Sequence, residues 1–295
     1  MSLAIKNPQK LCTDIENFIK KQVKEFNRNG AIVGVSGGID SALTLKLCVN
    51  ALGKEKVLAL LMFERDSNEE NRKDAKELVK SLGVRQKEIN ITQQLRNFPV
   101  YRYAPTILMR PGLVRKGYEF FTKKTGKTIL QQSLKGSHNR AVCLANAFYR
   151  LKHRTRMVNL YYHAEVENLL AVGAANKTES RIGFFVKYGI DDSTDIMPII
   201  GLYKTQVRYL AKFFKLPEKI IKKNPSPDMV AGLTDEIAIG LNYEKLDCIL
   251  DALEHKESIK SIAKSCNIAE KKVKYIKELT AKSTHMRSHA VCFNF

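Results

Sequence analysis

The chain has 295 residues, 44% hydrophobic and 27% charged, with a net charge of +20 at pH 7. These values indicate a globular chain with ample core for one large domain or two small ones, and they exclude a disordered polymer. No apolar run reaches the roughly 18 residues that span a bilayer, and no secretory signal follows Met1, so we expect a cytoplasmic protein without a membrane segment.

The first predicted element is an amphipathic helix over residues 7–29, where apolar side chains recur at spacings of three and four. Asn29-Gly30 ends this helix in a turn, and Ala31-Ile32-Val33 then reads as a short buried strand. The apolar residues of 42–49 have helical spacing. The order is therefore strand, glycine-rich loop, helix.

The loop between these two elements, Gly34-Val35-Ser36-Gly37-Gly38-Ile39-Asp40-Ser41, predicts an anion-binding site. Such a loop directs backbone N–H groups and a helix N-terminus at one point, which suits a phosphate chain. Gly37 and Gly38 let the backbone approach a phosphate closely, while Ser36 and Ser41 add hydroxyl donors. Asp40 supplies a carboxylate suited to Mg²⁺. The Gly-Lys-Ser/Thr ending of the Walker loop is missing.

The next stretch continues the alternation of strands and helices. Residues 56–62 are a continuous apolar run, typical of a strand buried on both faces. Residues 68–82 read as a helix that Gly83 closes, and Arg85–Ile91 reads as a third strand. This rhythm predicts an α/β fold with a doubly wound parallel sheet, whose ligands bind at the carboxyl ends of the strands.

Residues 96–140 do not continue this alternation of strands and helices, and we interpret about 100–140 as an inserted basic segment. The stretch from Tyr101 to Arg140 contains nine Lys or Arg residues and a single acidic residue, Glu119. Aromatic residues are interleaved with them: Tyr101, Tyr103, Tyr118, Phe120 and Phe121. This mixture is compatible with nucleic-acid binding. The interpretation we favour is a subdomain whose aromatics form its own core, because no RNA-binding motif is present.

Beyond the insertion, residues 141–168 read as a long helix and Leu169–Gly173 as a buried strand. The strand runs into Ala174-Ala175-Asn176-Lys177-Thr178-Glu179, a second polar loop that precedes a helical stretch. In a doubly wound sheet this loop lies beside the first one. Lys177 is then placed to neutralise phosphate, and Glu179 to share Mg²⁺ with Asp40.

The C-terminal part reads as further helices around a loop. An amphipathic helix is expected over 202–211, a Pro- and Gly-rich loop over 224–236 and two or three helices over 243–282. We see no internal repeat or linker and predict a single domain over 1–295. The six cysteines are scattered without a Cys-x-x-Cys pair, which argues against a zinc site or disulfide framework.

The loop at 34–41 resembles the SGGxDS signature of the ATP pyrophosphatases, or PP-loop enzymes. Further motifs follow it in order: NKTE at 176–179, GFFVKYG at 183–189, LYKTQVR at 202–208, PSPD at 225–228, TDE at 234–236 and His-x-Arg at 285–287. As a set these motifs resemble the ammonia-dependent NAD⁺ synthetases. That resemblance implies a homodimer that uses Mg-ATP to adenylate the carboxylate of deamido-NAD and then lets ammonia displace AMP.

The resemblance also implies a set of site residues. ATP is expected on Gly34, Ser36, Gly37, Gly38, Ile39, Asp40, Ser41, Lys187 and Thr234, and magnesium on Asp40 and Glu179. Asp40, Lys177 and Lys187 are the expected catalytic residues. The dinucleotide substrate is expected on Arg154, Asn176, Asp195 and His285. The ammonia is expected to be free or delivered by a separate glutaminase subunit, because the chain has no glutaminase portion.

The chain departs from the family pattern in several places. Ala174 replaces a threonine, Met286 replaces a lysine, Phe63 replaces a proline, and residues 190–195 replace a Gly-Gly-containing segment. Three alternatives stay open. These departures favour an amide ligase acting on another carboxylate, and the charge favours a PP-loop enzyme acting on tRNA through the basic segment. The third, a nucleotide-binding protein without activity, is disfavoured because Asp40 and Glu179 are both present. The charge of +20 itself favours polyanionic partners and a plain lysine-rich surface about equally.

Overall fold

Four parallel strands form the centre of the fold. In this computed structural model they are β1 (Gly30–Gly34), β2 (Val57–Phe63), β3 (Arg85–Asn90) and β4 (Leu169–Val172), in the order β3-β2-β1-β4. The structure describes residues 3–99, 101, 112, 116–117, 122–123, 126, 128–134, 136–225, 234–288 and 292–293. The predicted parallel α/β sheet is confirmed.

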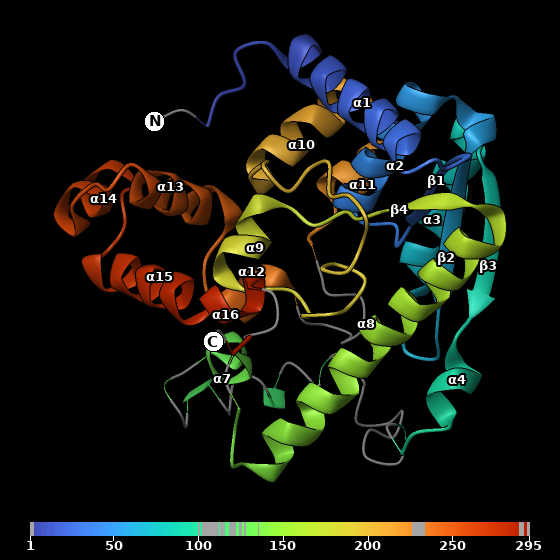
Figure 1. The fold of residues 1–295 in the computed structure, drawn as a ribbon. Helices are drawn as coiled ribbons and strands as arrows, with labels where there is room; N and C mark the ends of the chain where they lie inside the picture. The colour runs from blue at the N-terminus through green and yellow to red at the C-terminus, as the bar shows by residue number, and fades with distance from the viewer. Residues whose placement is uncertain are drawn as a thin grey trace.

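The chain crosses from strand to strand through helices on both faces of this sheet (Figure 1). The helices and short turns of the N-terminal part are α1 (Pro8–Glu25), α2 (Ile39–Leu52), η1 (Lys54–Lys56), α3 (Glu69–Leu82), α4 (Thr92–Arg96), α7 (Ile129–Ser133) and α8 (Arg140–Glu167). Those of the C-terminal part are α9 (Lys177–Ile182), α10 (Lys204–Phe213), α11 (Glu218–Lys222), α12 (Asp235–Ile239), α13 (Tyr243–Glu254), α14 (Ile259–Ser265), α15 (Glu270–Lys282) and α16 (Thr284–Arg287).

Alternating side chains of the strands feed two apolar cores. Ala31 and Val33 of β1 pack with α1, α2, α3, α10 and α11 on one face, and Ile32 packs with α4 and α8 on the other. Because all seven residues of β2 are buried, this strand has no polar face, as its continuous apolar run predicts. β3 lies at the edge of the sheet with mostly exposed side chains.

A third apolar core lies within the C-terminal helices. Residues of α12, α13, α14 and α15 make up most of it, and Ile182 of α9 joins it from the site side. Figure 1 shows α13, α14 and α15 gathered to one side of the sheet, with α9 and α12 between them and the strands. The expected helices over 243–282 are therefore present as α13, α14 and α15.

One disulfide corrects the cysteine prediction. Cys248 of α13 is bonded to Cys266, the residue that follows α14. The two are 18 residues apart in the chain, and only the folding of α14 against α13 brings them together. No local spacing reveals such a pair. Cys12 and Cys48 are free and buried.

The basic segment is only partly within the described residues. Tyr101 packs against the β2–α8 core, and its hydroxyl donates to Glu64 at 2.8 Å. Glu64 in turn accepts from the buried ammonium of Lys152 at 2.7 Å, which ties the end of β2 to α8. Tyr101 is thus a packing residue. Tyr103, Tyr118, Phe120 and Phe121 lie outside the described residues. Within the described part of the chain, no helix combines the length and apolarity that crossing a membrane requires.

Candidate active site

The phosphate loop follows β1 and ends at the first turn of α2. Gly38 is the N-cap of α2, and its N–H donates to Ser36 Oγ at 3.2 Å. Ser41 Oγ donates to the Gly38 carbonyl at 3.0 Å and lies 3.2 Å from Ser36 Oγ. These bonds hold the two hydroxyls side by side at the amino end of a 14-residue helix, where its dipole favours an anion.

Gly37 is the position of this loop that only glycine fits. Its φ is +85°, and a Cβ built there would lie 2.2 Å from the Asn71 carbonyl oxygen. The phosphate loop therefore packs closely against the first turn of α3, and this contact supports the conformation of the loop.

A pocket of about 210 Å³ opens at the carboxyl ends of β1, β2 and β4. Of the predicted residues, it is lined by Gly34, Ser36, Gly38, Ile39, Asp40, Ser41 and Glu179. Further lining side chains come from α8, α10 and α12, among them His153, Lys204 and Asp235. The structure thus brings the two predicted loops together at one cavity.

A buried lysine joins the two loops. Lys204 Nζ lies 2.5 Å from Asp40 Oδ2 and 2.9 Å from Glu179 Oε1, and its side chain is 2% exposed. Asn176 Nδ2 donates to the other Asp40 oxygen at 2.9 Å, and its own Oδ1 caps α9 through the Glu179 N–H. Two carboxylates from distant parts of the chain therefore converge on a single cation.

Helix α13 holds this arrangement in place through Asp247. Asp247, which is fully buried, accepts from the Thr178 hydroxyl at 2.6 Å and from the Thr205 N–H at 2.8 Å. Thr178 Oγ1 also accepts from the Lys204 N–H at 2.8 Å. The start of α9 and the start of α10 are thereby clamped together, which aims Lys204 and Glu179 at the same point.

The electrostatics of this cluster favour a further cation. Burial raises the pKa of Glu179 to about 8, with Asp40 and Asp235 adding to the effect and Lys204 opposing it. Burial alone would lower the pKa of Lys204, but Asp40 and Glu179 raise it well above its usual range. A bound cation would favour the ionised form of Glu179 and so oppose the effect of burial. Two hard carboxylate oxygens beside a phosphate loop are the donor set that Mg²⁺ takes with nucleotides, so the residues fit this ion.

Replacing Glu179 by Gln should change how stability depends on pH. Since the pKa of Glu179 is about 8 in the folded chain and near 4.5 otherwise, the folded state holds a proton that the unfolded state releases between these values. We therefore expect the wild-type melting temperature to fall as the pH rises from 5 to 8 without added magnesium, and the Gln variant to fall less. Melting curves at several pH values test this, and equal slopes would contradict it.

Lys177 does not lie with this cluster. Its Nζ pairs with Glu254 Oε2 of α13 at 2.6 Å and lies 4.4 Å from the centre of the Tyr203 ring. Arg181 pairs with the same carboxylate, also at 2.6 Å. The cation that meets Asp40 and Glu179 is Lys204 instead. Lys204 belongs to the LYKTQVR motif, and the sequence alone predicts no role for it.

Three predicted residues, Arg154, Lys187 and His285, lie together and are not among the residues that line this pocket. Arg154 of α8 donates to the Lys187 carbonyl at 3.2 Å, and Lys187 Nζ donates to the His285 carbonyl at 2.9 Å. Arg154 and His285 are exposed. Neighbouring Met286 is buried in the C-terminal core, which explains why an apolar residue suits this position in the fold.

The last two predicted residues support local structure. Asp195 accepts from the Tyr161 hydroxyl at 3.0 Å and from the Ala171 N–H at 2.8 Å, so it ties β4 to α8. Thr234 is the N-cap of α12 and accepts from the Ile237 N–H at 3.3 Å. Residues 226–233, which precede it and include most of the PSPD motif, lie outside the described residues.

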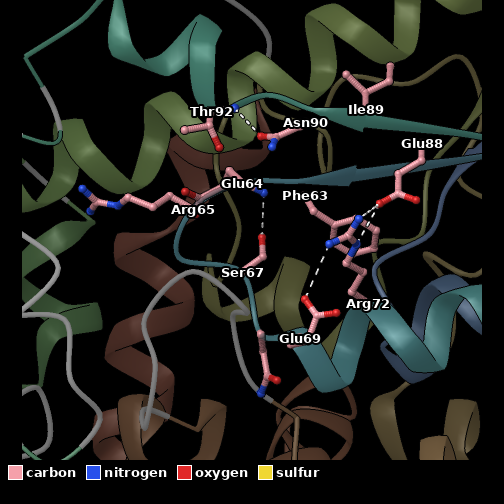
Figure 2. Close-up of a pocket in the computed structure, with 11 residues that line it drawn as sticks. Phe63, Glu64, Arg65, Ser67, Glu69, Arg72, Glu88, Ile89, Asn90 and Thr92 are labelled. Atoms are coloured by element: carbon pink, nitrogen blue, oxygen red, sulfur yellow. Dashed lines mark hydrogen bonds and ion pairs between the residues drawn. The ribbon is translucent and has the colours of Figure 1, made fainter.

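A second, smaller pocket of about 110 Å³ lies beside the ends of β2 and β3 (Figure 2). Arg72 is one of the residues that line it. Its Nε donates to Glu88 at 2.7 Å, and its NH1 lies 3.6 Å from Glu69. Figure 2 shows the guanidinium next to the Phe63 ring, between these two acids. Because Arg72 is already neutralised in this way, the larger pocket is the better candidate for a nucleotide.

Comparison with known proteins identifies the family of the chain. The family model described as NAD synthase matches residues 11–109 and 124–290, so only 110–123 of the basic segment are left out within the match. The NH(3)-dependent NAD(+) synthetase of Thermotoga maritima is 45% identical over 244 residues, which are 82% of this chain and 86% of that one.

Solved structures are similar over nearly the whole chain. The NMN synthetase of Francisella tularensis has a TM-score of 0.73 at 26% identity, covering 99% of this chain and all of the other. The NH3-dependent NAD synthetase of Campylobacter jejuni has a TM-score of 0.68 at 27% identity, covering 98% and 100%. From the family match, the 45% identity and the shared fold, the chain belongs to the NAD synthase family.

Proposed function

We propose that this chain is an ammonia-dependent ligase that converts deamido-NAD, ATP and ammonia into NAD⁺, AMP and pyrophosphate. The observation that carries the proposal is the meeting of Asp40 and Glu179 on Lys204 beside the phosphate loop, in a member of the NAD synthase family. This arrangement supplies what cleavage of ATP between the α and β phosphates requires, namely an anion cradle, a buried cation and two carboxylates that would hold a metal ion.

In the first step, a carboxylate oxygen of deamido-NAD attacks the α-phosphorus of ATP and pyrophosphate leaves. The N–H groups and hydroxyls at the start of α2 hold the departing phosphates. Lys204 offsets the negative charge that grows on them, in a buried setting where a cation acts strongly. Asp40 and Glu179 are the residues that would hold Mg²⁺, which neutralises phosphate charge when bound.

In the second step, ammonia attacks the acyl adenylate and AMP leaves. We propose that the nitrogen is free ammonia or comes from a separate glutaminase. Arg154 and His285, which are both linked to Lys187 through backbone carbonyls, remain proposed contacts to the dinucleotide together with Asn176 and Asp195. Lys187 and Thr234 remain proposed contacts to ATP. A cytoplasmic location remains our expectation.

The direct test is an assay with a panel of acids. Purified chain receives Mg-ATP, ammonium chloride and either deamido-NAD, nicotinate mononucleotide or tRNA, and pyrophosphate and amide product are measured. We expect NAD⁺ and pyrophosphate in equal amounts from deamido-NAD. Preference for the mononucleotide would replace the proposal by the activity named for the Francisella relative, and pyrophosphate release only with tRNA would overturn it.

The outer face of α8 supports the proposed homodimer. Val158, Tyr162 and Val166 follow one another at intervals of four residues and are 60%, 63% and 64% exposed. An apolar stripe of this kind on a surface helix commonly marks a protein interface. Arg156 of the same helix does not belong to this face, because it is buried and donates to the Met62 carbonyl at 3.1 Å.

Replacing Tyr162 by Glu should separate the two copies. A charge in the middle of the stripe opposes burial against a second chain, whereas it costs little on an exposed helix face. We expect a dimer for the wild type and a monomer for the Glu variant by light scattering at micromolar concentration. Lys24→Glu on the exposed part of α1 is the matched control and should stay dimeric. A wild-type monomer would contradict the proposal.

A further inference from the structure

A histidine on α8 lines the same pocket as the phosphate loop. His153 is 8% exposed, and its Nδ1 lies 2.7 Å from Asp191 Oδ2. Both ring nitrogens are buried and lack a well-aligned hydrogen-bond partner among the residues that the structure describes, so the ring is engaged only by the ion-pair contact of Nδ1 with Asp191. A buried polar atom without a partner is costly, so a pocket that retains one indicates a group that is to meet a ligand.

The ring is fixed from several sides. Tyr149, one turn earlier on α8, packs against it in a tilted arrangement with ring centres 4.8 Å apart. Gly189 packs so closely that a Cβ there would lie 2.9 Å from the His153 Cβ. Burial opposes ionisation of Asp191, but His153, Arg156 and Lys204 together hold its pKa below the usual range. An ionised Asp191 favours the tautomer with hydrogen on Nδ1, which leaves the Nε2 lone pair free.

The other ionisable groups around His153 are held by partners or by burial of their own. Lys204 forms ion pairs with Asp40 and Glu179, which are the proposed magnesium ligands. Its charge also favours the ionised form of Asp235. Lys204 and Arg156 stay charged, and burial raises the pKa of Tyr149 far beyond neutrality. Among the described residues that line this pocket, His153 is the only imidazole. Its Nε2 is without a partner in the described part of the chain, whereas Glu179 is engaged by Lys204, so His153 is the candidate proton acceptor of the pocket.

The amidation step needs such a group. When ammonia attacks the acyl carbon, the new C–N bond leaves a positive charge on nitrogen and a negative charge on oxygen. One proton must leave the nitrogen before the carbonyl can reform and the C–O bond to AMP can break.

We propose that His153 Nε2 accepts this proton, with Asp191 as the residue that positions the ring. The electrons of the broken N–H bond stay on nitrogen, AMP departs with the electrons of the C–O bond, and the imidazolium later releases its proton to water. The inference rests on the proposed function, because it names the base for its second step. It also gives a role to the 190–195 segment, where the chain departs from the family pattern.

The test compares two nucleophiles on His153→Gln. Hydroxylamine is largely unprotonated at pH 7 and its adduct loses a proton easily, so it captures the acyl adenylate without help from a base. We expect NAD⁺ formation from ammonia to fall by about 100-fold, within the range of general base catalysis. Hydroxamate formation from hydroxylamine, and the accompanying pyrophosphate release, should change less than threefold. Asp191→Asn should show the same selectivity, more weakly.

His163→Gln is the matched control. This second histidine of α8 is also buried, but it lies outside the pocket and its Nδ1 is 3.3 Å from Lys87 Nζ. It should leave both nucleophiles unaffected. An equal loss with ammonia and hydroxylamine on His153→Gln would assign His153 to substrate binding or folding and overturn the proposal, as would no loss at all. Failure of the proposed function is distinguishable, because wild-type chain would then form no NAD⁺.

Discussion

Asp40→Asn is expected to lower pyrophosphate release by at least about 1,000-fold while leaving the fold intact. Asp40 is the point at which the phosphate loop, Lys204 and Asn176 meet, and its carboxylate is a proposed magnesium ligand. Asparagine keeps the shape and still accepts from Asn176, but it removes the charge that attracts the metal. Removing charge stabilisation of this kind commonly costs two to three orders of magnitude in rate, and loss of the metal adds to it.

The measurement is pyrophosphate release together with the melting temperature. Asp14→Asn, on the exposed side of α1, is the control and should behave as wild type in both. A near wild-type rate for Asp40→Asn would show that this carboxylate does not serve ATP cleavage. Loss of the folded state would instead show that its role is structural.

Lys204→Met is expected to abolish turnover and also to destabilise the chain. The side chain is fully enclosed and faces Asp40, Glu179 and Asp235, so its removal leaves buried carboxylates without a counter-charge. Breaking a buried ion pair from one side typically costs about 3–5 kcal/mol. Urea unfolding and the pyrophosphate assay give the two quantities.

The double variant Lys204→Met, Glu179→Gln separates the two effects. Removing one of the stranded carboxylates should restore part of the free energy of unfolding, since fewer buried charges remain unpaired. Turnover should stay absent, because both the cation and a proposed metal ligand are gone. If Lys204→Met alone retained wild-type turnover, the central place of Lys204 in the site would be wrong.

The sheet could be predicted because its strands have distinctive patterns. β2 is apolar throughout, since both of its faces are covered, and the glycine loop marks the end of β1. β3 has the sequence RQKEIN without a continuous apolar pattern, because it lies at the edge of the sheet with mostly exposed side chains. The disulfide was missed because Cys248 and Cys266 meet only through the packing of α13 with α14.

The site was predictable in part for a similar reason. Residues in the two loops after β1 and β4 follow strand ends, so the fold alone places Asp40 and Glu179 side by side. Lys204 stands in an ordinary amphipathic helix, where sequence does not distinguish a buried ammonium from an exposed one. The pairing of His153 with Asp191 joins α8 to a turn 38 positions away, and the direction of Lys177 depends on Glu254 of α13. Such contacts are set by tertiary packing, which single-residue patterns do not record.

The central claim is that the carboxylate of deamido-NAD becomes bonded to the α-phosphorus of ATP. Deamido-NAD labelled with ¹⁸O in both carboxylate oxygens tests this when it is incubated with the chain, Mg-ATP and ammonia, and the products are weighed by mass spectrometry. We predict one ¹⁸O in the phosphate of AMP, one in the amide of NAD⁺ and none in pyrophosphate. NAD⁺ formed with unlabelled AMP would contradict the account.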